Sequence, residues 1–168
     1  ARSVGIARGL VYRTFSSKEE LFVLTVTDYL AELAGLLRAA ADGADEPREQ
    51  LERLANAFAG FARRYPAFLD SSLALMRRPA GELRRVVSDS VWLRLGQGMA
   101  SCIGQLADVL RAGNEAGEFD LDDPDFTANL LWTQTLGAMH LARIGVGVRR
   151  AGPQVPELFE VTAEQVAV

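Results

Sequence analysis

The residues with the clearest chemical bias lie at the N-terminal end, where basic and aromatic side chains alternate with apolar ones. Residues 1–18 contain Arg2, Arg8, Arg13 and Lys18 and no acid, which leaves −8 for the rest of a chain whose net charge is −4. Guanidinium, ammonium and phenol groups, here including Tyr12, donate hydrogen bonds to phosphate oxygens, and arginine can bind guanine through two of them. This asymmetry predicts an anionic partner at one end of the chain.

Cys102 and His140 are the strongest nucleophile and base candidates, and each is the only residue of its type. No Ser/His/Asp order, glycine-rich phosphate loop or metal-ligand spacing accompanies them. A single histidine on an apolar helix is typical of a hydrogen-bonded core residue. We therefore expect no catalytic residues, no cofactor and no metal, and an enzyme built on a helical bundle stays open as an alternative.

An aspartate-rich run around Pro124 superficially resembles a calcium-binding loop. Its acids are Asp120, Asp122, Asp123 and Asp125. The glycine and the terminal glutamate of an EF-hand are missing. The pair Asp123-Pro124 instead predicts the start of a helix, with a capping carboxylate followed by a preset φ angle.

The basic residues need helices to position them. The run Ser17-Lys18-Glu19-Glu20 has the spacing of a capping box, which predicts a helix over residues 18–40. Gly5 precedes a shorter expected helix over residues 7–14. A glycine turn, a short helix and then a new helix is the order of a helix-turn-helix DNA reader followed by a connecting helix.

Residues 1–21 resemble the end of the helix-turn-helix signature of the tetracycline-repressor (TetR) family of bacterial transcription regulators. The matching positions are Ala1, Gly5, Ile6, Val11, Tyr12, Phe15, Ser17, Lys18, Glu19 and Leu21. The resemblance implies that Arg8, Gly9, Leu10 and Arg13 face the major groove of DNA. It also implies that Tyr12, Thr14 and Lys18 hold phosphates.

The sequence departs from the family pattern in two respects. Ala7 stands where the family usually has a serine or threonine, and Thr14 replaces the usual histidine or tyrosine. The first helix and most of the second helix of the motif do not precede Ala1. We therefore expect the native gene product to begin upstream of this residue.

Apolar spacing predicts helices through most of the remaining chain. The expected helices cover residues 47–65, a short segment ending near Arg78-Pro79, residues 83–113 either whole or kinked near Gly96 and Gly98, and residues 125–147. Residues 149–158 contain Gly152, Pro153 and Pro156 and are predicted to be an extended connector. Thr162 and Gln165 have capping-box spacing and predict a further helix. We find no alternating strand pattern, so the expected fold class is all-α.

The resemblance divides the chain into residues 1–40, the remainder of a DNA-binding domain with its connecting helix, and residues 41–168, a ligand-binding and dimerisation domain. Aromatic, sulfur-containing and histidine side chains are candidates to line an apolar ligand cavity. These are Phe58, Phe61, Phe68, Met76, Trp92, Met99, Cys102, Trp132, Met139 and His140. Plain core packing remains the alternative for each of them.

The helix expected over residues 125–147 is apolar on two sides, and a helix buried all round in a small domain needs a second surface to cover it. One side carries Phe126, Leu130, Leu141 and Ile144. The other carries Ala128, Trp132, Thr135, Met139 and Ala142, which we expect in a homodimer interface together with Val161 and Val166 from the following helix.

Composition is typical of one globular unit, with 49% hydrophobic and 24% charged residues in 168. A single cysteine excludes an intramolecular disulfide framework, and a cytoplasmic protein is expected. The leading hypothesis is a ligand-responsive regulator, a repressor that binds a palindromic operator as a homodimer and is released by a small apolar effector. The alternatives are a helical-bundle binding protein and an enzyme, in either case without DNA binding.

Overall fold

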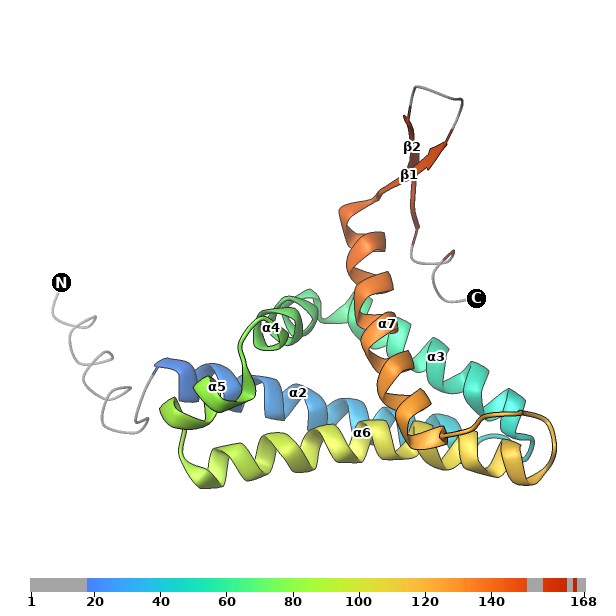
Figure 1. The fold of residues 1–168 in the computed structure, drawn as a ribbon, viewed down its shortest axis with the longest axis horizontal. Coiled ribbons are helices and arrows are strands. Elements are labelled where there is room, and N and C mark those ends of the chain that lie inside the picture. The colour runs from blue at the N-terminus through green and yellow to red at the C-terminus, as the bar shows by residue number, and fades with distance from the viewer. Residues whose placement is uncertain (1–17, 151–155, 163–164, 166–168) are drawn as a thin grey trace, which may run out of the picture.

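The computed structural model describes residues 18–150, 156–162 and 165, and it is built almost wholly from helices (Figure 1). The elements in chain order are α2 (Lys18–Ala41), α3 (Pro47–Arg64), α4 (Pro66–Met76), α5 (Ala80–Val86), α6 (Asp89–Glu115), α7 (Pro124–Ile144), β1 (Val146–Arg150) and β2 (Pro156–Glu160). The expected all-α class is confirmed, and the helix predicted over residues 18–40 agrees with α2 to within a residue.

The two long helices α2 and α6 lie side by side and run in the same direction (Figure 1). The thiol of Cys102 donates to the carbonyl oxygen of Leu30 at 3.4 Å, and the side-chain amide of Gln105 donates to the carbonyl oxygen of Ala34 at 3.0 Å. Gly98 permits this close packing, because a Cβ atom there would lie 3.1 Å from the Cβ atom of Leu30.

The N-terminal ends of the same two helices are also joined. Glu20 is buried in the first turn of α2, and its carboxylate accepts hydrogen bonds from the backbone N–H of Ser88, at 3.2 Å, and from the Ser88 hydroxyl. Ser88 is the N-cap residue that immediately precedes α6. The start of α2 is therefore fixed to the start of α6 by a buried charge-assisted contact.

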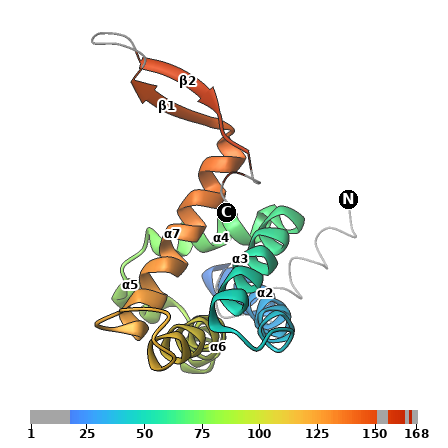
Figure 2. The same ribbon diagram turned by 90° about the vertical axis from the view of Figure 1, so that its right-hand side faces the viewer.

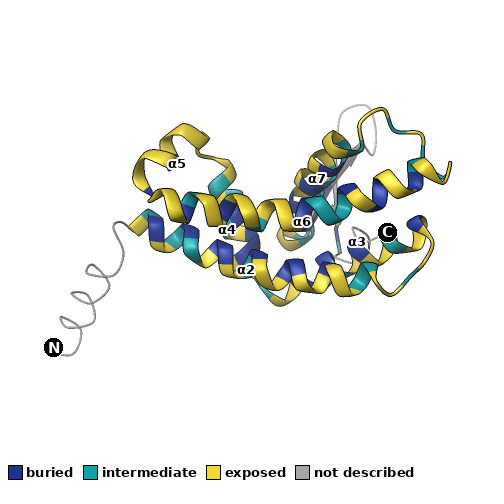
Figure 3. Cartoon of the chain, turned by 90° about the horizontal axis from the view of Figure 1, so that it is seen from below, coloured by how far each residue is buried: buried dark blue, intermediate teal, exposed yellow. Residues whose placement is uncertain are grey.

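Helices α3, α4 and α7 cover one side of the α2–α6 pair, as the end view shows (Figure 2). Buried residues follow the inward faces of the helices (Figure 3). At the centre, Tyr29, Phe58, Phe61 and Phe68 form a cluster of aromatic rings with mostly edge-to-face contacts. Such contacts add to the stabilisation from apolar burial.

Local signals set the ends of α3, α4 and α7. Each of these helices has a proline in its first turn, where the missing N–H is not needed. The carboxylate of Asp123 accepts from the backbone N–H of Phe126 at 2.9 Å, which confirms the cap predicted there. Gly145 ends α7 with a φ of 74°, a left-handed conformation that glycine adopts without steric strain.

The predicted helix over residues 83–113 is interrupted, but not at the glycines. The break falls at Val87 and Ser88, between α5 and α6, and α6 is continuous through Gly96 and Gly98. Gly96 is exposed with no atom near its missing Cβ, whereas Gly98 makes room for α2. Of the two alternatives, the uninterrupted helix is therefore wrong at Val87 and Ser88, and the kink near the glycines is wrong because one glycine serves helix packing and the other meets only solvent.

The predicted extended connector over residues 149–158 was also wrong. Its described residues belong to an antiparallel hairpin in which Val146 pairs with Glu160 and Val148 with Leu158. The hairpin projects from the end of α7 away from the helices (Figure 1). Thr162 and Gln165 exchange the two hydrogen bonds of a capping box, at 2.9 and 3.4 Å, as predicted.

Candidate functional site

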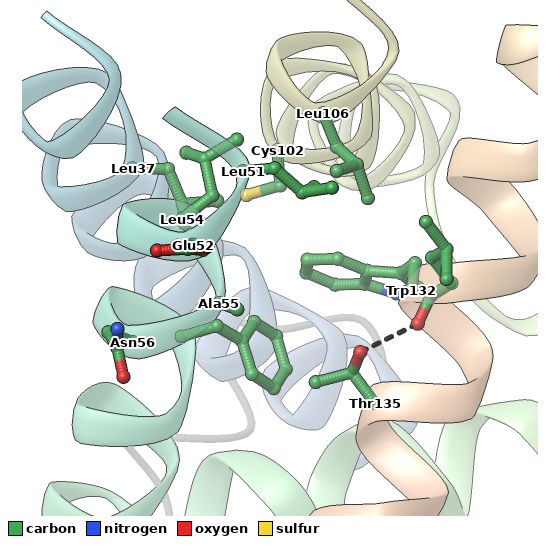
Figure 4. Close-up of a pocket in the computed structure, with 12 residues that line it drawn as sticks. Leu37, Leu51, Glu52, Leu54, Ala55, Asn56, Cys102, Leu106, Trp132 and Thr135 are labelled. Carbon is green, nitrogen blue, oxygen red and sulfur yellow. Dashed lines mark hydrogen bonds between the residues drawn. The ribbon is translucent and has the colours of Figure 1, made fainter. Parts of the chain in front are cut away.

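A cavity of about 630 Å³ lies between α3 and α7, with residues of α2 and α6 completing its wall (Figure 4). This volume is typical of small-molecule sites. Its lining residues are Leu37, Leu51, Glu52, Leu54, Ala55, Asn56, Phe58, Cys102, Leu106, Leu131, Trp132 and Thr135. The lining is mainly apolar, and Glu52 is its only charged member.

Helical periodicity places these side chains at the cavity. On α3, Leu51, Leu54, Ala55 and Phe58 are spaced by threes and fours and form one face of the helix. Glu52 and Asn56 flank that face and are exposed, so they belong to the rim. The facing wall comes from Trp132 and Thr135 on α7 (Figure 4). Leu131 of the same helix also belongs to the lining.

Trp132 dominates the α7 wall. Its side chain is 8% exposed, and its ring contacts that of Phe58 in a T-shaped arrangement with centroids 5.3 Å apart. Its indole N–H has no hydrogen-bond partner in the part of the chain that the structure describes. The hydroxyl of Thr135, nearly one turn further along α7, donates to the carbonyl oxygen of Leu131 at 2.7 Å (Figure 4).

Cys102 is part of the cavity wall on the side of α6, and it is 1% exposed. Burial raises the pKa of its thiol to about 12, because the apolar surroundings disfavour the thiolate. A thiol with this pKa is a poor nucleophile near neutral pH, since the thiolate is the reactive form. The environment of Cys102 therefore favours a packing role over a catalytic one.

Three of the predicted ligand-binding residues, Phe58, Cys102 and Trp132, meet in the cavity. Phe61 and Phe68 are instead buried in the aromatic cluster behind it. Four other candidates lie outside the lining: Met76 and Met99 are exposed, and Trp92 and His140 are half-buried. Met139, the remaining candidate, is buried and also lies outside the lining. The Nδ1 atom of His140 is buried and has no hydrogen-bond partner among the described residues.

The cavity residues that sequence reasoning missed are mostly aliphatic. Leu37, Leu51, Leu54, Leu106 and Leu131 line it but are indistinguishable by type from core leucines. Their periodic spacing shows only that they face inward. Thr135 was expected at a dimer interface. The spacing of its side of α7 suits a contact with a partner helix as well as a cavity wall, so the sequence could not distinguish the two.

The predicted dimer-interface residues do not form one exposed surface. Ala128, Met139 and Val161 are buried within the chain, Ala142 is half-buried, and Trp132 and Thr135 line the cavity. Val166 lies outside the described residues. The opposite side of α7 is the exposed one, and it carries Phe126, Leu130, Leu141 and Ile144.

The predicted DNA-binding residues fall almost entirely outside the described part of the chain. Those not described are Arg8, Gly9, Leu10, Tyr12, Arg13 and Thr14. Lys18 is exposed at the first residue of α2. The expected capping residue Ser17 also lies outside.

Two acids of the aspartate-rich run around Pro124 have structural roles. Asp123 caps α7, and both oxygens of Asp125 accept from Arg111 of α6, at 3.0 and 3.2 Å. No group of three or more potential metal-ligating side chains occurs within the described ranges. No described helix is long and apolar enough to cross a membrane.

Comparison with protein-family models and with curated protein sequences finds no match. The solved structures similar to this chain include two bacterial regulators. The first is a TetR family transcriptional regulator, PfmR from Thermus thermophilus, with a TM-score of 0.66 and 22% identity over 99% of this chain and 80% of that one. The second is a bacterial regulatory protein in the tetR family from Rhodococcus, with a TM-score of 0.65 and 18% identity over 83% of this chain and 70% of that one. The chain therefore has the fold of these TetR-family regulators.

Proposed function

We propose that this chain is a ligand-responsive, DNA-binding transcription regulator of the TetR type, a repressor without enzymatic activity. The observation that carries the proposal is the structural similarity to a regulator of that family over 99% of the chain, with a TM-score of 0.66. The motif resemblance at residues 1–21 supports it independently, because it rests on the sequence alone. The buried, high-pKa thiol of Cys102 also argues against nucleophilic catalysis.

In the proposed mechanism, Arg8, Gly9, Leu10 and Arg13 read base edges in the major groove. Tyr12, Thr14 and Lys18 contact phosphates. Two such readers in a homodimer would enter successive major grooves about 34 Å apart on a palindromic operator. Their separation depends on α2, because α2 follows the reader segment in the chain.

The cavity is placed where a ligand can act on α2. Leu37 of α2 and Cys102 and Leu106 of α6 line it, so an effector would touch both long helices. The contact of Glu20 with Ser88 joins the same helices at the end next to the reader. An effector that changes how α6 sits on α2 would thereby change the reader separation. A coupling of about 1–3 kcal/mol would weaken DNA binding several-fold to a hundredfold.

The dimer surface that we propose is the exposed side of α7 rather than its inward side. Phe126 and Ile144 are 66% and 58% exposed, and Leu130 and Leu141 lie on the same side of the helix. An apolar stripe of this kind is unfavourable in water and favours a self-complementary contact with a second copy.

The test is fluorescence anisotropy of the complete gene product on DNA flanking its own gene, over a salt series. The regulator proposal expects tight, sequence-selective binding that falls log-linearly with salt. Tyr12→Ala should lose affinity, and Arg8 or Arg13 substitutions should change the sequence preference.

A helical ligand-binding protein without DNA binding is the alternative, and the cavity alone would suit it equally well. Weak binding without sequence preference, both to flanking DNA and in a genome-wide selection, would favour this alternative. In that case the basic N-terminal segment would serve an acidic partner or only solubility.

A further inference from the structure

The walls of the cavity differ in what they offer a ligand. No lysine, arginine or histidine of the described chain lines it, and its one charged side chain, Glu52, is acidic. A carboxylate or phosphate entering this space would lose hydration without gaining a cation. It would also approach the carboxylate of Glu52 at the rim.

The α7 wall offers hydrogen bonds instead. The indole N–H of Trp132 is a donor that no described residue satisfies, on a side chain more than nine-tenths buried. The Nε1 atom itself is not fully buried, so it remains accessible to an acceptor atom of a bound molecule. A ligand oxygen that accepts from it would gain a hydrogen bond in a mainly apolar site. The oxygen of Thr135, whose proton is given to Leu131, can still accept. The wall thus presents a donor and an acceptor on neighbouring turns of one helix.

We propose that the cavity binds an uncharged, mainly apolar molecule that carries a hydroxyl group, and that it selects against carboxylates. The hydroxyl oxygen accepts from Trp132, its proton can be donated to Thr135, and the hydrocarbon part fills the space between the leucines and Phe58. The regulatory meaning of this ligand rests on the proposed function, but its binding does not.

The experiment measures displacement of the uncharged fluorescent probe N-phenylnaphthylamine from the full-length protein near neutral pH. The competitors are octanol, octanoate and octylammonium, which share a chain length and differ in head group. Octanol should compete at least about tenfold better than octanoate. Each inhibition constant is corrected for the affinity of the probe in that variant.

Any apolar site prefers an alcohol to a carboxylate, so the comparison of octanol with octanoate is not specific to this cavity. Substitutions of Trp132 and Glu52 provide the specific test. Trp132→Phe keeps an aromatic ring and removes the N–H, so octanol affinity should fall about two- to tenfold. The affinity of octylammonium should stay unchanged within about twofold, since an ammonium group has no lone pair to accept that hydrogen bond. Glu52→Gln should improve octanoate binding about two- to fourfold and leave octanol unaffected.

Two substitutions by the bulky side chain of tryptophan show where the probe binds. Ala55→Trp extends a small cavity-lining side chain and should abolish probe binding, whereas Ala100→Trp, at an exposed position of α6 outside the lining, should not. Circular dichroism of each variant shows that the helices are retained.

The inference is overturned if octanoate competes as well as octanol, if Trp132→Phe weakens octanol and octylammonium equally, or if Ala55→Trp leaves probe binding intact. None of these readouts involves DNA. Alcohol binding without any effect on operator binding would therefore refute the effector part of the proposed function and leave the cavity assignment standing.

Discussion

Substitution of Gly113 by alanine is expected to destabilise the protein, although alanine is the better helix former. Gly113 lies near the end of α6, and a Cβ atom there would fall 2.1 and 2.2 Å from Cδ2 and Cε2 of Phe119. Ordinary van der Waals contact begins at 3.4 Å, so the ring must move by more than an ångström.

The main chain leaves the Phe119 ring little room to retreat. The backbone N–H groups of Glu118 and Phe119 donate to the carbonyl oxygen of Gly113, at 2.8 and 3.2 Å. Beyond them, Asn114 forms two side-chain hydrogen bonds with the backbone of Leu121, at 2.7 and 3.1 Å. Overpacking of this kind costs about 1–3 kcal/mol. The gain in helix propensity offsets at most about 1 kcal/mol.

We therefore expect Gly113→Ala to lower the free energy of unfolding by about 1–2 kcal/mol, which corresponds to about 2–8 °C in Tm for a chain of this size. Urea denaturation and thermal scans at one fixed protein concentration measure both quantities. The matched control is Gly96→Ala in the same helix, where the site is exposed and no atom lies within 4 Å of the new Cβ. That variant should gain about 0.5–1 kcal/mol.

Equal stability of Gly113→Ala and Gly96→Ala would contradict this expectation. A second comparison isolates the cause. In a Phe119→Ala background the obstructing ring is absent, so Gly113→Ala should no longer destabilise. If the loss persists there, the ring is not responsible for it.

Three further predictions concern the cap, the thiol and the dimer. Asp123→Ala should lower stability in urea by about 1 kcal/mol, because the N–H of Phe126 loses its acceptor, and Asp122→Ala, which removes no cap, should be near neutral. The pKa of Cys102 rises on folding from 9.0 to about 12, so the stability that its thiol contributes is complete below pH 9 and is lost as pH rises toward 12. Between neutral pH and pH 10, the free energy of unfolding should therefore fall by about 1.4 kcal/mol more in the native protein than in Cys102→Ala. Parallel curves of unfolding free energy against pH for the two proteins would contradict this. Ile144→Asp should shift the protein toward monomer in analytical ultracentrifugation, whereas Leu93→Asp, at a similarly exposed leucine of α6, should not.

Helix positions could be predicted well where an apolar stripe and a local stop signal agree. Leu51, Leu54, Phe58 and Phe61 define the buried side of α3, and Pro66 marks its end, so the predicted and observed helices differ by one residue. The break between α5 and α6 was missed because Val86 and Val87 continue the apolar spacing across it. The hairpin was missed because its strands have only five residues each and, with Gly147 in one and Pro156 in the other, show no alternating pattern of apolar and polar residues.

The cavity was harder to predict than the helices. Periodicity shows that Phe58, Phe61 and Phe68 all face inward, but not that only the first borders unfilled space. Whether space remains between helices depends on how far apart α3 and α7 are held, which is a property of the whole packing. Which side of α7 is covered by its own chain could not be predicted for a related reason. Both of its faces are apolar, and only the packed structure shows that Ala128 and Met139 are covered by their own chain.

The parallel arrangement of α2 and α6 has a consequence for how quickly the chain can fold. Parallel neighbours cannot be joined by a short turn, so α3, α4 and α5 must carry the chain back before α6 can pair with α2. The contacts that lock the pair join residues 68 to 72 positions apart. Loops of this length must close before the contacts can form, and folding rates fall as the mean sequence separation of contacts rises. We therefore expect folding slower than that of an up-and-down bundle of equal length, with α2 protected from hydrogen exchange only after α6 has docked.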